Sequence, residues 1–107
     1  MSGSRARSVA SLLNAILLLA PVVAAAADPE RGLQLGRRWC ASCHLVEAVG
    51  PASDAAPPFV AISMDPAITP ERLHAWLTKP HPPMPDLQLT RSEEDDILAY
   101  IMSLKSR

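Results

Sequence analysis

Both cysteines of the chain and one of its three histidines lie within five residues, in the stretch Cys40-Ala-Ser-Cys43-His44. Any cross-link or ligand set that uses thiols must therefore form here. Residues 28–107, which we predict to be the mature domain, number 80 (107 − 27), and domains this small bury a thin core and often depend on a disulfide, a metal or a cofactor. Because only four aromatic residues are available to fill that core, we expect something else to supply the missing apolar bulk.

The first 27 residues have the pattern of a secretory signal peptide. Arg5 and Arg7 supply a positive start, an apolar stretch follows, and small residues precede Asp28. The uninterrupted apolar run 15–27 is shorter than the roughly 20 residues that a membrane span needs. An uncleaved N-terminal anchor is the alternative. We predict a signal peptide over 1–27, cleavage after Ala27, a mature domain over 28–107 and a periplasmic location.

The charge of the mature domain limits its partners. Residues 28–107 contain eight Lys and Arg against eleven Asp and Glu, which leaves a formal charge of −3. Domains that bind nucleic acid or acidic lipid surfaces usually present a basic stripe. We therefore predict no nucleic-acid partner, and a soluble protein once the signal peptide has been removed.

The first predicted helix begins at Asp28-Pro29-Glu30, where an N-cap side chain precedes proline and an acid. One face of it carries Gly32, Gly36, Trp39 and Cys40, so the helix is expected to end near the cysteines. Each interior glycine costs about 1 kcal/mol relative to alanine. That cost is understandable if another helix crosses closely at these positions.

Two further helices are indicated downstream. One begins at Thr69-Pro70-Glu71 and must stop before Pro80. The other starts with a capping box of Thr90 and Glu93 and carries an apolar stripe of Ile97, Tyr100, Ile101 and Leu104. The prolines of 49–68 indicate a loop without a strand, and those of 80–85 a stiff, extended backbone. The predicted fold class is all-α with proline-rich loops.

The Cys-x-x-Cys-His motif admits four interpretations. A disulfide between Cys40 and Cys43 would close a very small loop and stabilise little through chain entropy. A structural zinc site normally takes four protein ligands, and the motif offers three. A thioredoxin-like dithiol belongs beside a strand in an α/β chain. The fourth is attachment of c-type haem, in which two thiols form thioethers with one porphyrin edge and His44 becomes an axial ligand of the iron.

The last interpretation fits an exported, helical domain, and the chain resembles a small class I cytochrome c over essentially all of residues 28–107. The matching pieces are the first helix running into CASCH, the proline-rich loop, WLTKPHPPMPDLQLT and ILAYIMSLK. The resemblance implies short helices and loops wrapped round one covalent haem c with its iron. It also implies that the N- and C-terminal helices cross at a glycine and an aromatic residue, here Gly32 or Gly36 against Tyr100.

A methionine in a proline-flanked loop is the second axial ligand that the resemblance implies. The Met-Pro pair of the family matches Met84-Pro85, which lies 40 residues after His44. Neighbouring prolines reduce the ordering entropy that a weak thioether ligand must overcome. Met84 is therefore the predicted metal ligand beside His44. Met64 is an alternative, and His81 would give a bis-histidine site of lower potential.

Two other contacts follow from the resemblance. His44 should donate its second ring N–H to a backbone carbonyl, for which the family uses a proline after the motif. Pro51 and Pro57 are both within range. Trp76 is a candidate to hydrogen-bond a haem propionate, with an ordinary core tryptophan as the alternative. His74 is expected at the surface.

An iron with both axial positions filled has no open site for a substrate, so we expect an electron-transfer protein and not an enzyme. The resemblance implies a periplasmic one-electron carrier that exchanges electrons with redox partner proteins in the periplasm or at the membrane. The alternatives are a cytochrome subunit of a periplasmic dehydrogenase complex and, if Met84 dissociates readily, a gas sensor or weak peroxidase. This chain lacks the ring of lysines that mitochondrial cytochrome c presents to its partners. Its own partners are therefore expected to dock through neutral, basic or apolar surfaces.

Overall fold

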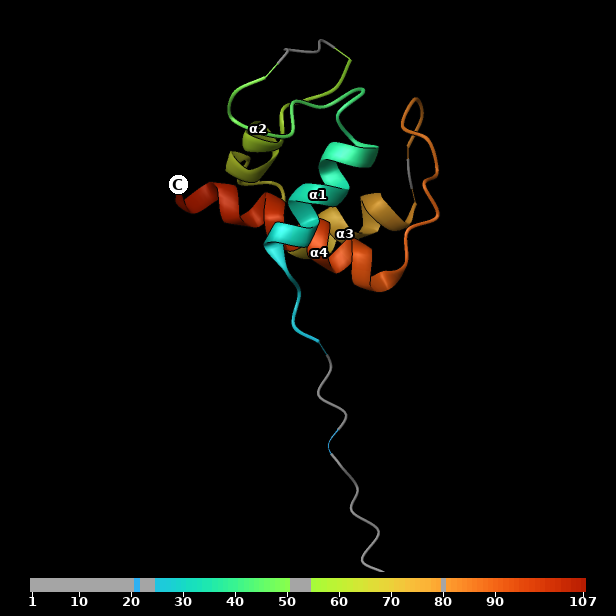
Figure 1. Cartoon of the computed structure of the whole chain (residues 1–107). Helices are drawn as coiled ribbons and strands as arrows, with labels where there is room; N and C mark the ends of the chain where they lie inside the picture. The colour runs from blue at the N-terminus through green and yellow to red at the C-terminus, as the bar shows by residue number, and fades with distance from the viewer. Residues whose placement is uncertain (1–20, 22–24, 51–54, 80) are drawn as a thin grey trace, which may run out of the picture.

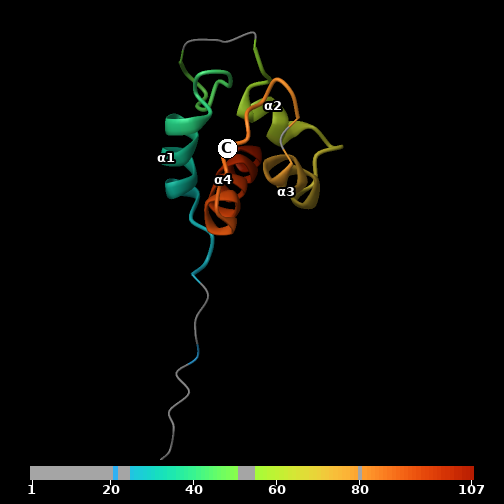
Figure 2. The ribbon, with the colours of Figure 1, turned by 90° about the vertical axis from the view of Figure 1, so that its right-hand side faces the viewer.

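The computed structural model describes residues 21, 25–50, 55–79 and 81–107, and within them the chain is helical and has no strand. Its elements are α1 (Pro29–Trp39), α2 (Phe59–Met64), α3 (Pro70–Thr78), α4 (Arg91–Ser103) and the short 3-10 helix η1 (Leu104–Ser106). Helix α4 lies between α1 on one side and α2 with α3 on the other (Figure 1, Figure 2). The predicted all-α class is confirmed. In this part of the chain, no helix is both long and apolar enough to cross a membrane.

Helix α1 has the ends that its sequence predicts. The Asp28 carboxylate accepts hydrogen bonds from the backbone N–H groups of Glu30 (2.9 Å) and Arg31 (3.3 Å), and proline follows the cap. At the other end the Cys40 N–H donates to the Gly36 carbonyl at 2.8 Å. The first cysteine is therefore the C-cap of α1, and the helix directs the chain into the motif.

The caps of α3 and α4 are also those predicted. Thr69 accepts a hydrogen bond from the Arg72 N–H at 3.2 Å, and α3 ends at Thr78. At α4 the Thr90 hydroxyl accepts from the Glu93 N–H (3.3 Å), and the Glu93 carboxylate accepts from the Thr90 N–H (2.8 Å). The Glu93 carboxylate also accepts a hydrogen bond from the Thr90 hydroxyl (2.9 Å), and the bonds to this carboxylate from the backbone and then from the side chain of Thr90 lower the pKa of Glu93.

The prediction of a loop over 49–68 is wrong for Phe59–Met64, which form α2. Pro58 is its N-cap, a position where the missing N–H of proline costs nothing. Phe59 and Ser63, four residues apart, are buried on one face, and α2 packs against α4. A six-residue helix is not stable in isolation, so tertiary packing and not local propensity forms it.

Helices α1 and α4 cross at Gly32. A Cβ atom at this position would lie 1.9 Å from the Asp96 carbonyl oxygen and 2.8 Å from the Tyr100 Cβ. The absence of a side chain therefore allows the two backbones to touch. This confirms the predicted crossing of a glycine against Tyr100 and selects Gly32 over Gly36.

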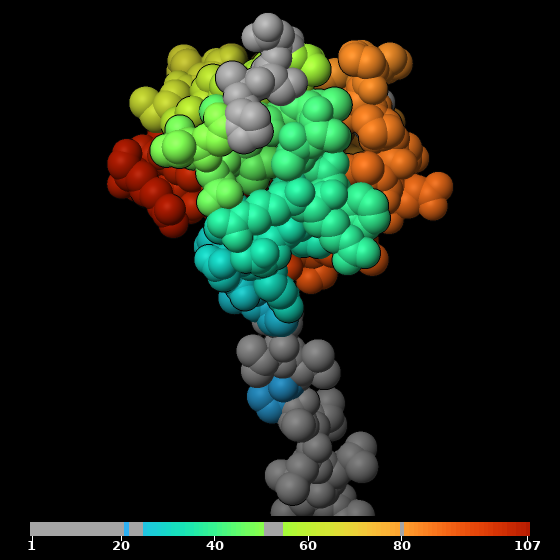
Figure 3. Space-filling view, turned by 45° about the horizontal axis from the view of Figure 1, so that its top comes forward, coloured from blue at the N-terminus to red at the C-terminus, as the bar shows by residue number. Residues whose placement is uncertain are grey.

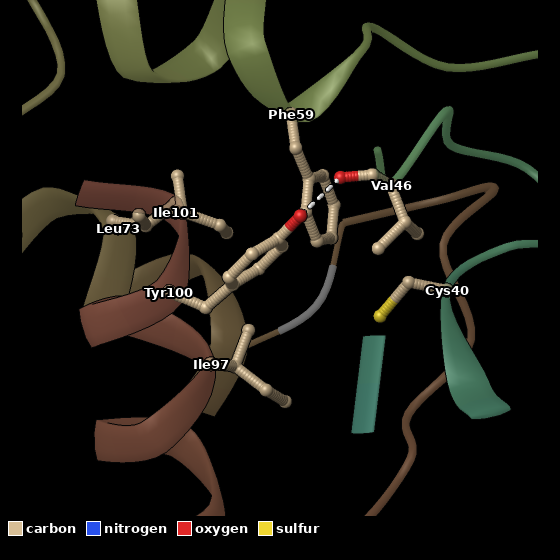
Figure 4. Close-up of a cluster of buried hydrophobic side chains, with 7 residues drawn as sticks. All are labelled: Cys40, Val46, Phe59, Leu73, Ile97, Tyr100 and Ile101. Carbon is tan, nitrogen blue, oxygen red and sulfur yellow. Dashed lines mark hydrogen bonds between the residues drawn. The ribbon is translucent and has the colours of Figure 1, made fainter. Parts of the chain in front are cut away.

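The core gathers around α4. Its buried apolar residues are Cys40, Val46, Phe59, Leu73, Ile97, Tyr100 and Ile101 (Figure 4). Three of the four predicted stripe residues of α4 are among them, whereas Leu104 is partly buried. The Tyr100 hydroxyl donates a hydrogen bond of 2.9 Å to the Val46 carbonyl inside this cluster. That bond ties the C-terminal helix to the loop that follows the motif.

Replacing Tyr100 by phenylalanine is expected to destabilise the protein by about 1–3 kcal/mol, because the buried Val46 carbonyl loses this donor. Urea unfolding measures the effect. Ser106→Ala is the control, since the hydroxyl of Ser106 donates to an exposed carbonyl, that of Ser103; its expected effect is within about 0.5 kcal/mol. Equal midpoints for Tyr100→Phe and the parent protein would contradict the prediction.

Candidate functional site

The motif continues the turn of α1 beyond the end of the helix. The N–H groups of Cys43 and His44 both donate to the Cys40 carbonyl, at 3.1 and 2.8 Å. Both thiols are free, with Cys40 buried and Cys43 exposed. The structure therefore contradicts the disulfide interpretation and leaves two separate thiols one turn apart.

Burial raises the pKa of the Cys40 thiol to about 11, and the neighbouring Cys43 adds a smaller rise. A reactive redox cysteine needs a lowered pKa instead. Among the described residues, no three His, Cys, Asp or Glu side chains are gathered as a metal site. The raised pKa argues against the dithiol interpretation, and the missing fourth ligand, in the part of the chain that the structure describes, argues against the zinc interpretation.

The ring of His44 is held by a backbone carbonyl. Its Nδ1 lies 2.7 Å from the oxygen of Pro57, so Nδ1–H donates and Nε2 keeps its lone pair. The Phe59 N–H donates to the Leu45 carbonyl at 2.9 Å, which joins the two segments beside this contact. Of the two prolines within range, Pro57 makes the contact; Pro51 lies outside the described residues.

Two cavities that share lining residues open beside the motif, with volumes of about 340 and 170 Å³. The residues common to both are Cys40, His44, Pro57, His81 and Met84. Cys43 lines the larger one only, and the smaller one extends into the core at Phe59 and Ile97. In Figure 3 the loop after residue 80 lies beside the segment that carries the motif. Apolar walls thus enclose the imidazole of His44 and the thiol of Cys40.

The structure separates the candidate methionines. Met84 is partly buried and lines both cavities, together with His44 and Cys40. Its N–H donates to the His81 carbonyl at 2.7 Å, so this loop contains a turn and is not extended throughout as predicted. Met64, at the end of α2, is 60% exposed and lines neither cavity.

Trp76 and His81 form one wall of the smaller cavity, with ring centroids 5.6 Å apart. Trp76 is 38% exposed, so it is not an ordinary core tryptophan. His81 reaches the same cavities as Met84. Both rings therefore face the space in which a cofactor would lie.

Charged residues at the end of α1 are engaged at the surface. The Arg37 guanidinium donates to both carboxylate oxygens of Glu47, at 2.6 and 3.0 Å. That hydrogen bonding lowers the pKa of Glu47. Arg38 lies 4.8 Å from the ring centroid of Trp39. Trp39 was expected on the packed face but is 43% exposed, and at the last position of α1 it lines the larger of the two cavities.

The prediction that His74 lies at the surface is wrong. Its side chain is 23% exposed, and its Nε2 lies 2.9 Å from the Oε2 of Glu94, without hydrogen-bond alignment. The Thr78 hydroxyl also donates to this carboxylate, at 3.3 Å. Glu94 precedes Ile97 by three residues, and that position on the apolar stripe was the available signal. The contact joins α3, which forms a wall of the smaller cavity, to α4.

Comparison with known proteins decides the family. A cytochrome c-552 of Bradyrhizobium diazoefficiens is 46% identical over 85 residues, which are 77% of this chain and 80% of that protein. The chain belongs to the small class I cytochromes c. A cytochrome bc1 complex cytochrome c subunit of Corynebacterium diphtheriae is 42% identical over 81 residues, 74% of this chain but 28% of that relative. No family model and no solved structure matches the chain.

As a cytochrome c, the protein carries covalently bound haem c with its iron, and it is an electron-transfer protein and not an enzyme. The site fits this cofactor. Two free thiols one turn apart lie at the edge of an apolar cavity. The contact of Nδ1 with Pro57 leaves the lone pair of His44 Nε2 available to bind the iron.

Proposed function

We propose that this cytochrome is a periplasmic one-electron carrier, with its haem attached through Cys40 and Cys43 and its iron ligated by His44 and Met84. The observation that carries the proposal is that these four side chains line one cavity of about 340 Å³. When bound, the haem supplies a one-electron couple that is reached through its porphyrin edge.

Each residue has a separate task in this proposal. The hydrogen bond to Pro57 fixes the plane and tautomer of His44. The neutral thioether of Met84 and the apolar walls both favour ferrous iron, so they raise the potential. With His44 and Met84 both bound to the iron, no position would be left for a substrate. Trp76, at the wall of the smaller cavity, is proposed to donate its indole N–H to a haem propionate.

The proposed location rests on the signal peptide pattern of 1–27. Residues 1–20 and 22–24 of that segment lie outside the described residues. Attachment of c-type haem takes place outside the cytoplasm, which agrees with export. Removal of the segment after Ala27 would leave a soluble domain with a formal charge of −3.

Absorption spectra and redox titration of the purified periplasmic protein test the proposal. We expect c-type bands that survive extraction of non-covalent haem, one reversible one-electron wave, and no uptake of carbon monoxide by the reduced protein at neutral pH. Uptake of carbon monoxide would instead favour the gas sensor or weak peroxidase.

A second candidate function is a cytochrome subunit of a larger redox complex, which includes the dehydrogenase alternative. The similarity to a cytochrome bc1 complex subunit favours it, although the chain spans 28% of that relative. Gentle solubilisation followed by size exclusion distinguishes the two functions. A carrier elutes at the mass of one small domain, whereas a subunit elutes with its partners.

Electron transfer is expected to depend weakly on salt. None of the described residues that line the larger cavity is Asp, Glu, Lys or Arg, so this part of the docking surface is uncharged. Between about 20 and 200 mM salt, the rate with a neutral acceptor should change less than about twofold. Stopped-flow kinetics with neutral, acidic and basic acceptors measure it. Fast, strongly salt-dependent transfer to an acidic acceptor would contradict the prediction.

A further inference from the structure

The backbone nitrogen of Asp28 is bound to a buried carboxylate on the opposite helix. Its N–H donates to the Asp96 Oδ1 at 2.7 Å, across 68 residues of sequence. The side chain of Asp96 is only 4% exposed. Asp28 is also the first residue after the proposed cleavage point. The atom that cleavage would turn into an α-amino group is thus already in contact with a carboxylate.

The charges around Asp96 are unbalanced in the uncleaved chain. Among the described residues, the salt bridges of the Asp28 and Asp96 carboxylates are both with Arg31, whose Nε donates to the Asp96 Oδ2 at 3.0 Å and whose Nη2 donates to Oδ1 at 3.4 Å. Arg38 and Glu93, which line the same surface pocket, add one charge of each sign. The side chain of Arg31 is 56% exposed, so solvent screens much of its interaction with the two carboxylates. A buried carboxylate needs compensation by close, hydrogen-bonded partners. One further cation at this point would balance the positive and negative charges.

We propose that cleavage between Ala27 and Asp28 supplies that cation, and that the new α-ammonium group forms an ion pair with Asp96 that fastens α1 to α4. Water hydrolyses the Ala27–Asp28 peptide bond, which leaves a carboxylate on Ala27 and an ammonium on Asp28. The inference rests on the export proposed above. It assigns a stabilising role to the new N-terminus that signal-peptide cleavage produces.

The surrounding structure is compatible with this change. Residues 25–27 are exposed and belong to no helix, and the chain enters α1 beside α4 (Figure 1). On cleavage the Asp28 nitrogen changes from one N–H donor to three, and its present acceptor, the Asp96 Oδ1, stays in place. The helix dipole opposes a positive charge at this end of α1, but a charge-assisted bond to a buried carboxylate is stronger than that exposed-terminus effect.

Four forms of the haem-containing protein test the ion pair. Chains beginning at Asp28 or at Ala26 are exported behind a heterologous signal peptide, each with Asp96 or with Asp96→Asn. Two extra residues move the ammonium by up to about 7 Å, and asparagine keeps an acceptor oxygen without charge. Urea unfolding of the oxidised forms gives the four stabilities, and the contribution of Arg31 cancels between the two starting points.

With Asp96 present, the chain beginning at Asp28 is expected to have a folding equilibrium constant about tenfold larger than the chain beginning at Ala26. In the Asp96→Asn background the two chains should be equally stable. A difference that is absent with Asp96, or that persists unchanged in the Asp96→Asn forms, overturns the ion pair.

Acetylation keeps the test decisive if Asp96→Asn does not fold. Acetylating the α-amino group of the chain that begins at Asp28 removes the charge but keeps an N–H donor. Acetylation also modifies the two lysines of the domain, and the same treatment of the chain that begins at Ala26 measures the effect of that modification on stability. If acetylation lowers the folding equilibrium constant about tenfold only in the chain that begins at Asp28, the proposal is supported. Equal decreases in both chains overturn it.

Mass spectrometry of the product exported with its own leader tests the cleavage point. A mature chain that begins at Asp28 supports the proposal, and any other first residue overturns it. None of these measurements depends on the iron ligands or the redox partner, so a failure here is distinct from a failure of the proposed carrier function.

Discussion

Replacing Gly32 by alanine is expected to cost about 3 kcal/mol or more, a large part of the 5–15 kcal/mol that typically stabilises a domain. The new Cβ would lie 1.9 Å from the Asp96 carbonyl oxygen and 2.6 Å from its carbon. These are backbone atoms of α4, so no rotamer change relieves the clash. The helices must separate, and the contacts of Asp28 and Arg31 with Asp96 would be lost with them. Urea unfolding of the oxidised protein measures the cost.

Gly36→Ala is the matched control, because it makes the same change one turn later in α1. Its Cβ would lie 3.0 Å from the Val46 Cγ1 and 3.3 Å from the Phe59 Cε2, which are side-chain atoms that can shift. Alanine also gains about 1 kcal/mol of helix propensity. We expect its cost to be smaller than that of Gly32→Ala by about 2 kcal/mol or more. Equal costs would show that the crossing does not depend on Gly32.

This crossing illustrates what the sequence can predict. Two glycines in a short helix were costly enough to indicate a close neighbour, and Tyr100 was the expected partner. Their spacing could not tell which glycine touches α4, because both lie on the same face. Only the packed structure distinguishes the backbone contact at Gly32 from the side-chain contacts at Gly36.

Elements with local end signals were predictable, and those formed by tertiary packing were not. The N-terminal ends of α1, α3 and α4 follow from their N-cap residues, Asp28, Thr69 and Thr90, whose side chains accept hydrogen bonds from nearby N–H groups. Helix α2 has no side-chain cap and six residues, so its sequence carries little signal. Its position depends on the burial of Phe59 against the core.

The candidate site divides in the same way. The Cys-x-x-Cys-His spacing and the Met84-Pro85 pair are local patterns, and the sequence alone is enough to propose their roles. Which proline faces His44 depends on how the chain returns after the motif, through the Phe59 to Leu45 hydrogen bond. The contact between His74 and Glu94 also depends on the packing of α3 on α4.

Replacing Met84 by alanine is expected to change the iron site more than any other single substitution outside the motif. We expect loss of the weak far-red sulfur-to-iron band, because Met84 is the only methionine among the described residues that line the two cavities; Met64 lines neither of them. The potential should fall by on the order of 0.1–0.2 V, a fraction of the roughly 0.8 V that axial ligands span. Absorption spectroscopy and redox titration measure both effects.

Two single variants serve as controls for this assignment. Met64→Ala removes a methionine that is 60% exposed and lies outside both cavities, so the band and the potential should stay unchanged. His81→Ala removes the only other described side chain in the loop after residue 80 that carries an axial-type donor and lines both cavities. The band should persist in that variant too. A band that is lost in either control and kept in Met84→Ala would overturn the proposed ligand.

Carbon monoxide connects this ligand to the function. In a carrier, Met84 would hold the iron in both oxidation states, so the reduced parent protein should exclude the gas and Met84→Ala should admit it. In that variant His81 would be the competing ligand, because it lines both cavities together with Met84. Met84→Ala combined with His81→Ala should therefore bind carbon monoxide at least as tightly as Met84→Ala alone. If the parent protein and Met84→Ala bind the gas equally well, Met84 does not close the site, and the sensor or peroxidase function becomes the better explanation.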